Sequence, residues 1–565
     1  MADTPEPPPV ADATGAASWA GALIEAQQVV MANMAALMAA LPGATPASAG
    51  GSAAPDPWET AAQLWRGILA PSPTIAPSAD RRFKAPAWRS PAFDLIRQGY
   101  EMLSAQLTEA AEALPGLDGR QREQLRFATR GFVDAISPAN FPLTNPEVIE
   151  RTLATRGESL RAGLDHLLAD MGKGQLTHTA AGAFEVGRDL ATTPGEVVAR
   201  TPLYELIQYA PTTEAVLAMP LVIFPPWINR FYILDLTPEK SFIRWCVEQG
   251  ITVFVVSWRS ADASLKDVTW DDYVAAQVEA VDTVRDLLGV PAAHAIGYCV
   301  AGTTLAATLA LLAARGEDER IASATFFTAQ VDFAGAGDLR HFVDDDQLAM
   351  LETLAPEGWF DGRYMAATFN LLRGRDLIWP YVTRHYLLGD DHPSFDLLHW
   401  NGDVTNLPAA WHRAYLADLY RDNRLVEPGA LSVDGTPLDL SRVRTPTYVQ
   451  AGREDHIAPA ESVWKITDHF AGPLRFVLAG SGHIAGVVNP PAAGKYEHWI
   501  NDHPAASLAE FVAGAREVKG SWWPDWLAWL RGHGEATVPA TGARVPGAGT
   551  LPSLGPAPGD YVRRR

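Results

Sequence analysis

From about residue 196 onward, short apolar runs alternate with stretches of helical spacing. The runs are rich in β-branched and aromatic residues, which favour strands. Strands that alternate with helices along a chain are typical of a mostly parallel β-sheet. The pattern therefore predicts such a sheet, with strands at 219–224, 252–258, 294–298, 321–327, 447–450 and 474–478.

The region before this sheet has a helical pattern. Between residues 86 and 195 apolar positions recur three or four residues apart, which predicts a mainly helical N-terminal domain. Residues 1–85 are rich in Ala and Pro and are expected to be flexible over much of their length. Within them, residues 18–41 predict an amphipathic helix, which packs either on the protein itself or on a partner or apolar particle.

Two parts of the predicted catalytic domain, 196–565, depart from the alternating pattern. Between about 330 and 440 the segment is rich in aromatic residues, His, Asp and Gly, as expected for a cap or lid inserted between strands. From about residue 532 the tail is rich in Gly and Pro, which predicts an extended surface segment. Before this tail, a helix is expected to pack on the core through Trp522, Trp523, Trp526 and Trp529.

The composition is that of a soluble globular enzyme, with 47% apolar and 20% charged residues over 565 positions. The net charge of -21 argues against nucleic acid as a partner, because binding phosphates requires clustered Lys and Arg. Cys246 and Cys299 are the only cysteines, which excludes a disulfide framework and favours a reducing compartment. The first residues do not resemble a secretory signal, so we expect a cytoplasmic protein.

Residues 295–314 carry no charge over about the length of a membrane span. Gly297, Gly302 and Thr303 interrupt the start of this stretch, and it follows directly on a strand-like run. These features favour a fully buried strand, turn and helix. We therefore expect no membrane span.

The same stretch contains the strongest candidate for chemistry. In HAIGYCVAGTTLAATLALL, Cys299 lies between a short apolar strand and a helix, where an α/β-hydrolase presents its nucleophile. The sharp turn requires small neighbours, and Gly297, Ala301 and Gly302 meet that need, although the motif usually has Gly where Ala301 stands. The alternative is a buried structural cysteine. We predict that Cys299 is a nucleophile on an α/β-hydrolase fold.

A thiol is little ionised near neutral pH, so Cys299 requires a base. In this fold an acid follows a later strand and a histidine follows the last one. The segments TPTYVQAGREDHIAP and LRFVLAGSGHIAG supply Asp455 and His483 in that order. Two alternatives remain open in the first segment: Glu454 as the acid, and His456 as a competing base or a residue of the substrate channel.

Acyl transfer also requires donors for the oxyanion. The backbone N–H of Val300, directly after Cys299, is the first candidate, and that of Ile228 in the loop PPWINRF is the second. Trp227 and Asn229 are expected to hold that loop. Cys246 lies in SFIRWCVEQG, a predicted helix, and is expected to be buried packing.

From SPANFPLTNPEV near residue 137 onward, nearly all of the chain resembles the polyhydroxyalkanoate synthases. This resemblance implies (R)-3-hydroxyacyl-CoA as substrate, release of coenzyme A and growth of a polyester, with Cys299 as nucleophile, Asp455 as acid and His483 as base. GYCVAGT and REDHI are similar to the single-subunit short-chain class, class I, which implies 3-hydroxybutyryl-CoA. The matching blocks are VGRDLATTPGEVV, FPPWINRFYILDL, FVVSWR, TWDDYV, GYCVAGT, HWNGDVTNLP, REDHIAP, GSGHIAGVVNPP and APGDYV.

The resemblance also implies a homodimer that works in the cytoplasm at the surface of polyester granules. We expect no metal and no cofactor, since coenzyme A is part of the substrate and a product. Two other functions compete. A thioesterase or polyester hydrolase would use the same triad, which alone does not separate transfer from hydrolysis. A non-catalytic scaffold would coat granules through residues 18–41, but the intact triad argues against it.

Overall fold

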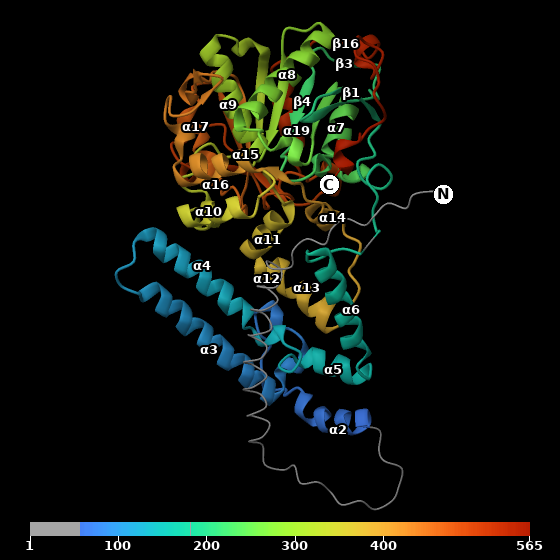
Figure 1. The fold of residues 1–565 in the computed structure, drawn as a ribbon, viewed down its shortest axis with the longest axis vertical. Coiled ribbons are helices and arrows are strands. Elements are labelled where there is room, and N and C mark those ends of the chain that lie inside the picture. The colour runs from blue at the N-terminus through green and yellow to red at the C-terminus, as the bar shows by residue number, and fades with distance from the viewer. Residues whose placement is uncertain (1–56, 181, 565) are drawn as a thin grey trace, which may run out of the picture. The chain divides into compact units, whose positions relative to one another are not determined.

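The computed structural model describes residues 57–180 and 182–564 (Figure 1). The amphipathic helix predicted at 18–41 lies outside these described residues. The chain forms two compact units, and their first boundary, after residue 177, comes earlier than the predicted one at 195. The described residues of the units are 57–177 with 373–392, and 178–180 with 182–372 and 393–564.

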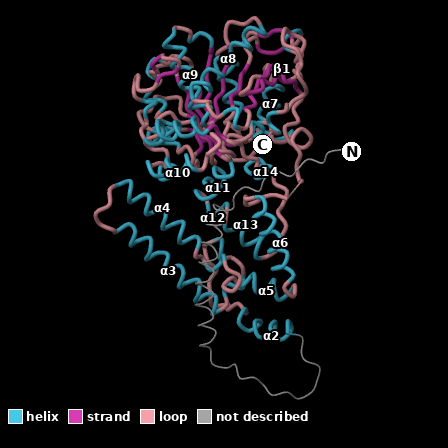
Figure 2. The backbone as a smooth tube through the Cα atoms, in the orientation of Figure 1, coloured by secondary structure: helices cyan, strands magenta, loops and turns pink. Residues whose placement is uncertain are grey.

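The described part of the first unit consists of helices and loops (Figure 2). Polar side chains cap these helices: Ser90 accepts a hydrogen bond from the Phe93 N–H, and Asp118 forms a capping box with Gln121. A small apolar core that includes Trp88 and Phe93 joins them. The helices are α2 (Pro57–Leu69), α3 (Pro91–Ala113), α4 (Gly119–Ala135), α5 (Pro146–Ala154), α6 (Glu158–Lys173), α12 (Gly374–Leu377), α13 (Trp379–Tyr381) and the π-helix η9 (Val382–Leu387).

Two features of this unit differ from the sequence expectations. α2 lies in the stretch expected to be flexible, and Leu69 at its end is buried in the apolar core. Residues 373–392 fall inside the range predicted for the lid but belong to this unit. The packing is so close that a Cβ atom on Gly163 of α6 would overlap the carbonyl of Tyr386. A helical pattern shows that a face is buried, but not which partner buries it.

The second unit contains a ten-stranded sheet in its described part. Its six central strands pair in parallel and coincide with the six predicted strands, which confirms the mostly parallel sheet. The two outer strands at each edge, which pair antiparallel, are absent from the prediction. In spatial order the strands are β1 (Gly195–Arg200), β2 (Tyr204–Tyr209), β5 (Val253–Trp258), β4 (Leu221–Phe224), β6 (Ala293–Tyr298), β7 (Ile321–Phe327), β12 (Thr447–Gly452), β13 (Leu474–Ala479), β14 (Glu497–Ile500) and β15 (Arg516–Lys519).

Both faces of this sheet are buried under helices (Figure 1). Alternate side chains of each strand enter different cores: Val222 and Phe224 join one apolar cluster, and Leu221 and Ile223 join the other. α8 (Trp270–Leu288) and α9 (Val300–Arg315) cover the first face, and α7 (Phe242–Glu248) and α19 (Trp523–Arg531) cover the second. The smaller helices of this unit are α16 (Ala460–Trp464), α17 (Ile466–His469) and α18 (Leu508–Gly514).

The uncharged stretch 295–314 forms most of β6 and α9. Every residue of α9 from Val300 to Leu312 is buried, which explains why the helix has no polar face. No helix in the described part of the chain is long and apolar enough to cross a membrane.

The inserted lid and the C-terminal tail complete the second unit. The lid touches the loop after β4, where Asn229 bridges Val404. The tail is extended as predicted, but it is also anchored: β16 (Thr537–Pro539) pairs with β3 (Ala215–Leu217), and Tyr561 is buried. The lid elements in this unit are α10 (Asp345–Thr353), β8 (Trp359–Phe360), α11 (Gly362–Leu372), α14 (Asp396–Gly402), β9 (Leu407–Pro408), α15 (Ala409–Ala414), the π-helix η10 (Tyr415–Arg421) and the hairpin of β10 (Ser432–Val433) and β11 (Thr436–Pro437).

Candidate active site

Cys299 occupies a strained turn between β6 and α9. Its φ of 53° and ψ of −126° lie where residues with a side chain are rarely found. Backbone hydrogen bonds hold this conformation: the Cys299 N–H donates to the carbonyl of Phe327 over 2.9 Å, and the Cys299 carbonyl accepts from Gly302 and Thr303. The turn therefore presents a half-buried thiol at the carboxyl end of the parallel strands.

The small residues around the turn differ in how little space they have for a larger side chain. A Cβ atom on Gly297 would lie 2.5 Å from the Cα of Gly302, and one on Gly302 would overlap the side chain of Ala329. Ala301, at the position where the motif usually has Gly, is fully buried in the apolar core. The close approach of strand and helix thus depends on Gly297 and Gly302, which explains why Ala301 is tolerated.

His483 and Asp455 meet although 28 residues separate them along the chain. His483 Nδ1 lies 2.7 Å from Asp455 Oδ2. The other carboxylate oxygen accepts the backbone N–H groups of Ile457 and Ala458, each over 2.9 Å. Because the Asp455 side chain is fully enclosed, these bonds fix both of its oxygens.

Glu454 and His456, the two alternatives in the same loop, differ in burial. Glu454 is exposed, and the structure brings Asp455 rather than Glu454 to His483. His456 is half-buried, and its backbone carbonyl packs beside Gly337. A role for His456 in the substrate channel stays a prediction.

Charge within the site acts on His483. Burial lowers the pKa of His483, but the Asp455 carboxylate, which is hydrogen-bonded to the imidazole, and the Cys299 sulfur raise it above its ordinary value. Asp455 and Cys299 therefore both act on the same imidazole.

Three aromatic side chains hold the loop that carries His483. The Tyr298 hydroxyl donates to the carbonyl of His483 over 2.9 Å. The indole N–H groups of Trp522 and Trp523 donate to the carbonyls of Gly486 and Val487, over 2.7 and 2.9 Å. The tryptophan cluster thus packs a helix on the core, as predicted, and also fixes the backbone after His483.

The predicted oxyanion donors lie near the same edge of the sheet. Val300 is the first residue of α9, and Ile228 follows β4, which pairs directly with β6. The loop of Ile228 is held by its neighbour: Trp227 stacks on Tyr273 with ring centroids 3.9 Å apart, and its carbonyl accepts from Thr405 over 2.6 Å.

The lid adds two tyrosines that the sequence reading missed. Burial raises the pKa of both Tyr415 and Tyr420, and a charge on Cys299 raises it further, so both phenols lie in the electrostatic surroundings of Cys299. Gln330 Nε2 donates to the Tyr420 hydroxyl over 3.4 Å. The only sequence signal for these residues is the aromatic richness of the lid segment.

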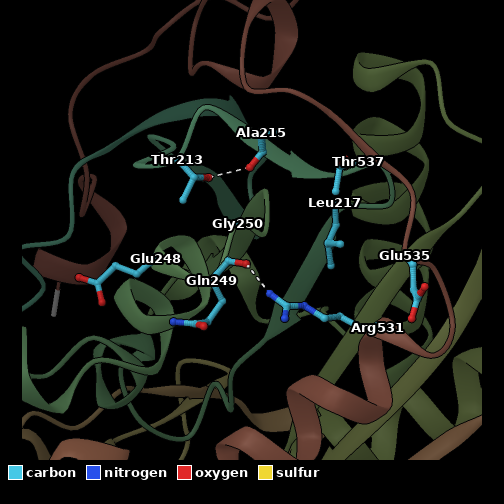
Figure 3. A pocket seen from close by; sticks show the side chains of 9 residues that line it. All are labelled: Thr213, Ala215, Leu217, Glu248, Gln249, Gly250, Arg531, Glu535 and Thr537. Carbon is cyan, nitrogen blue, oxygen red and sulfur yellow. Dashed lines mark hydrogen bonds between the residues drawn. The ribbon is translucent and has the colours of Figure 1, made fainter.

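One surface hollow lies away from this site. It has a volume of about 430 Å³ and is lined in part by Leu217 and Gly250, which precede β4 and β5 (Figure 3). Arg531 donates across it to the carbonyl of Gln249. Because Cys299 follows the carboxyl end of a strand parallel to β4, the hollow and the triad lie at opposite ends of the strands.

Two family models match the chain. That for the N-terminus of poly-beta-hydroxybutyrate polymerase (PhaC) matches residues 79–246. That for the alpha/beta hydrolase fold matches residues 221–490, a range that contains Cys299, Asp455 and His483.

Curated relatives match most of the chain. The poly(3-hydroxyalkanoate) polymerase of Methylorubrum extorquens is 46% identical, and the match covers 90% of this chain and 84% of that protein. The poly(3-hydroxyalkanoate) polymerase subunit PhaC of Rhizobium meliloti (strain 1021) is 44% identical with the same coverage. The subunit of that name from Cupriavidus necator is 44% identical, with 89% and 86% covered. The chain therefore belongs to the family of poly(3-hydroxyalkanoate) polymerases, which are acyltransferases, and has their α/β-hydrolase fold.

Proposed function

We propose that this enzyme polymerises (R)-3-hydroxyacyl-CoA into a polyester with release of coenzyme A, and that Cys299 carries the acyl chain. The observation that supports this most is the connected set of Cys299, His483 and Asp455 in a member of the polymerase family. A nucleophile, a base and a group that orients the base are what covalent acyl transfer requires.

In the first step His483 takes the proton of Cys299, and the thiolate attacks the thioester carbonyl. The Val300 N–H, joined by that of Ile228, stabilises the tetrahedral oxyanion. The bond from the carbonyl carbon to the sulfur of coenzyme A then breaks, and His483 returns its proton to that sulfur. The acyl group is now a thioester on Cys299.

In the second step the 3-hydroxyl of another unit attacks this thioester. His483 takes the hydroxyl proton, the new ester bond forms, and the bond to the Cys299 sulfur breaks. Asp455 acts by orienting His483, because one of its oxygens binds the imidazole and the other binds two backbone N–H groups.

The thiol and the lid favour polymer over free acid. Transfer of the acyl group from coenzyme A to the Cys299 thiol replaces one thioester by another, so its free energy is nearly balanced. The acyl group on Cys299 therefore stays activated for transfer. The buried side chains of Trp411 and Tyr420 from the lid help to exclude water. This exclusion is our reason for preferring a polymerase to a thioesterase or polyester hydrolase.

The finer points of the proposal rest on resemblance. GYCVAGT and REDHI favour 3-hydroxybutyryl-CoA as the substrate. The family further supports a homodimer that acts in the cytoplasm at the surface of the polyester granule.

Purified full-length protein incubated with (R)-3-hydroxybutyryl-CoA tests the proposal, with thiol release and turbidity followed together. We expect release of coenzyme A with insoluble polymer, lost in Cys299→Ala and strongly reduced in Cys299→Ser. Release with only soluble acid would identify a thioesterase, and no release would contradict both functions.

A further inference from the structure

A buried polar pair, Gln330 and Tyr420, lies beside the nucleophile and has no part in the triad. Gln330 follows β7, whose last carbonyl accepts the Cys299 N–H. The carbonyl of Gln330 accepts the Thr303 hydroxyl over 2.7 Å, and the Thr303 N–H donates to the carbonyl of Cys299. The backbone of Gln330 is therefore fixed to the first turn of the helix that Cys299 begins.

The hydroxyl of Tyr420 already accepts one hydrogen bond. Gln330 Nε2 donates to it over 3.4 Å, and the ring of Tyr415 lies edge-on to that of Tyr420 at 5.5 Å between centroids. A phenol has two acceptor positions and one proton to donate. Among the described residues no acceptor is recorded for that proton.

Gln330 has an unsatisfied acceptor, whereas Tyr420 has an unsatisfied donor. Its side-chain oxygen Oε1 is buried and has no hydrogen-bond partner in the described part of the chain, although the residue is only 4% exposed. Leaving a buried acceptor unsatisfied is costly, so an acceptor of this kind calls for an explanation. The site thus offers an unused acceptor on Gln330 and an unused donor on Tyr420, joined by a hydrogen bond.

We propose that Gln330 and Tyr420 bind the 3-hydroxyl group of the acyl chain at Cys299. An alcohol both donates and accepts a hydrogen bond. The 3-hydroxyl therefore donates its proton to Gln330 Oε1, and its oxygen accepts the Tyr420 O–H. The 3-hydroxyl is two carbons from the thioester carbonyl, so a group that binds it must lie near the nucleophile. The pair then selects acyl groups that carry this hydroxyl and orients the oxygen. This assignment rests on the proposed function.

Acylation of Cys299 by two substrates tests the assignment. Stopped-flow detection of the first coenzyme A released per enzyme compares (R)-3-hydroxybutyryl-CoA with butyryl-CoA, which lacks the hydroxyl but still carries a reactive thioester. We expect the wild type to react about tenfold faster or more with the hydroxylated substrate, since a site built for a hydroxyl discriminates against its absence.

Tyr420→Phe and Gln330→Met should each lower the rate with (R)-3-hydroxybutyryl-CoA by about tenfold, the value of one hydrogen bond to a bound hydroxyl, and leave butyryl-CoA unchanged. Tyr209→Phe is the matched control, because Tyr209 is a buried tyrosine of β2 whose hydroxyl has no recorded partner among the described residues. It should leave both rates unchanged.

Three outcomes would overturn the assignment. Equal wild-type rates for the two substrates would do so without any variant. Variants that slow both substrates equally would show that the pair only packs the site. If the wild type released no coenzyme A from either substrate, the proposed function would fail first and this inference with it.

Discussion

The two cysteines of this chain lie in regions that give the same side chain opposite properties. Cys299 occupies a strained turn at the carboxyl end of β6, is half-buried and interacts electrostatically with His483. Cys246 lies inside α7, is completely buried, and burial raises the pKa of its thiol well above the ordinary value. The comparison teaches that the backbone and the neighbouring charge, rather than the thiol itself, determine which cysteine can react.

Cys246 lies in an apolar cluster, and burial is the cause of its raised thiol pKa. Its helix packs against tryptophans of α19, as in the contact of Trp245 with Trp523 at 5.3 Å between ring centroids. A thiolate there would lose hydration without gaining a partner. Cys246 therefore behaves as a small apolar side chain.

The largest expected effect comes from removing each thiol in turn. Cys299→Ala should release no measurable coenzyme A from (R)-3-hydroxybutyryl-CoA, because no covalent acyl intermediate can form. Cys246→Ala should keep near-normal turnover and lose only about 1 kcal/mol of unfolding free energy from reduced packing. Turnover and urea denaturation measure the two effects, and loss of turnover in the well-folded Cys246 variant would break the comparison.

Alkylation should distinguish the same two thiols in the native protein. Limiting iodoacetamide should label Cys299, and Cys246 should react only after unfolding. Burial lowers the pKa of His483, but the Asp455 carboxylate and the Cys299 sulfur raise it above its ordinary value, so the imidazole keeps its proton through neutral pH and places a positive charge beside Cys299. At pH 6.5 we expect His483→Gln to slow labelling of Cys299 by about 10- to 100-fold.

Peptide mass mapping with intact-mass kinetics measures this labelling. The ratio of the labelling rate of the wild type to that of His483→Gln should shrink as pH rises toward 9, because an unassisted thiol then ionises by itself. An advantage that does not change with pH would mean that His483 does not act through charge.

The sequence predicted the centre of the sheet and the triad because local patterns carry them. Each parallel strand is an apolar run, and Cys299, Asp455 and His483 each follow such a strand, so their meeting at one edge follows from topology. The edge strand β15, with the sequence REVK, is short and polar, and its pairing depends on β14 rather than on its own composition.

What could not be predicted depends on contacts between distant segments. Gln330 meets Tyr420 across 90 positions of the chain, and neither lies in a motif. Residues 373–392 have an unremarkable helical pattern, so the sequence does not reveal that they pack with the first unit. Long-range packing decides both, and periodicity reports only that a face is buried.

A third test concerns the strain that distinguishes the Cys299 turn. Gly302→Ala should place a methyl group against Ala329 and force strand and helix apart, with a loss of about 1–3 kcal/mol in unfolding free energy and a larger loss of turnover. Ala301→Gly is the matched control: it creates the usual motif and should change turnover little. Denaturation midpoints and coenzyme A release measure both, and similar behaviour of the two variants would refute the unequal roles of these positions.

The smallest expected effect concerns the indole that fixes the loop of His483. Trp522→Phe keeps an aromatic ring in the core but removes the N–H that donates to the carbonyl of Gly486, a bond worth about 0.5–1.5 kcal/mol. If this bond orients His483, turnover should fall several-fold while the KM for the acyl-CoA stays constant. Trp529→Phe, from the same cluster but with a partly exposed ring, should leave turnover unchanged. Equal turnover in the two variants would mean that Trp522 contributes packing alone, and that His483 is positioned by Asp455 and the Tyr298 hydroxyl.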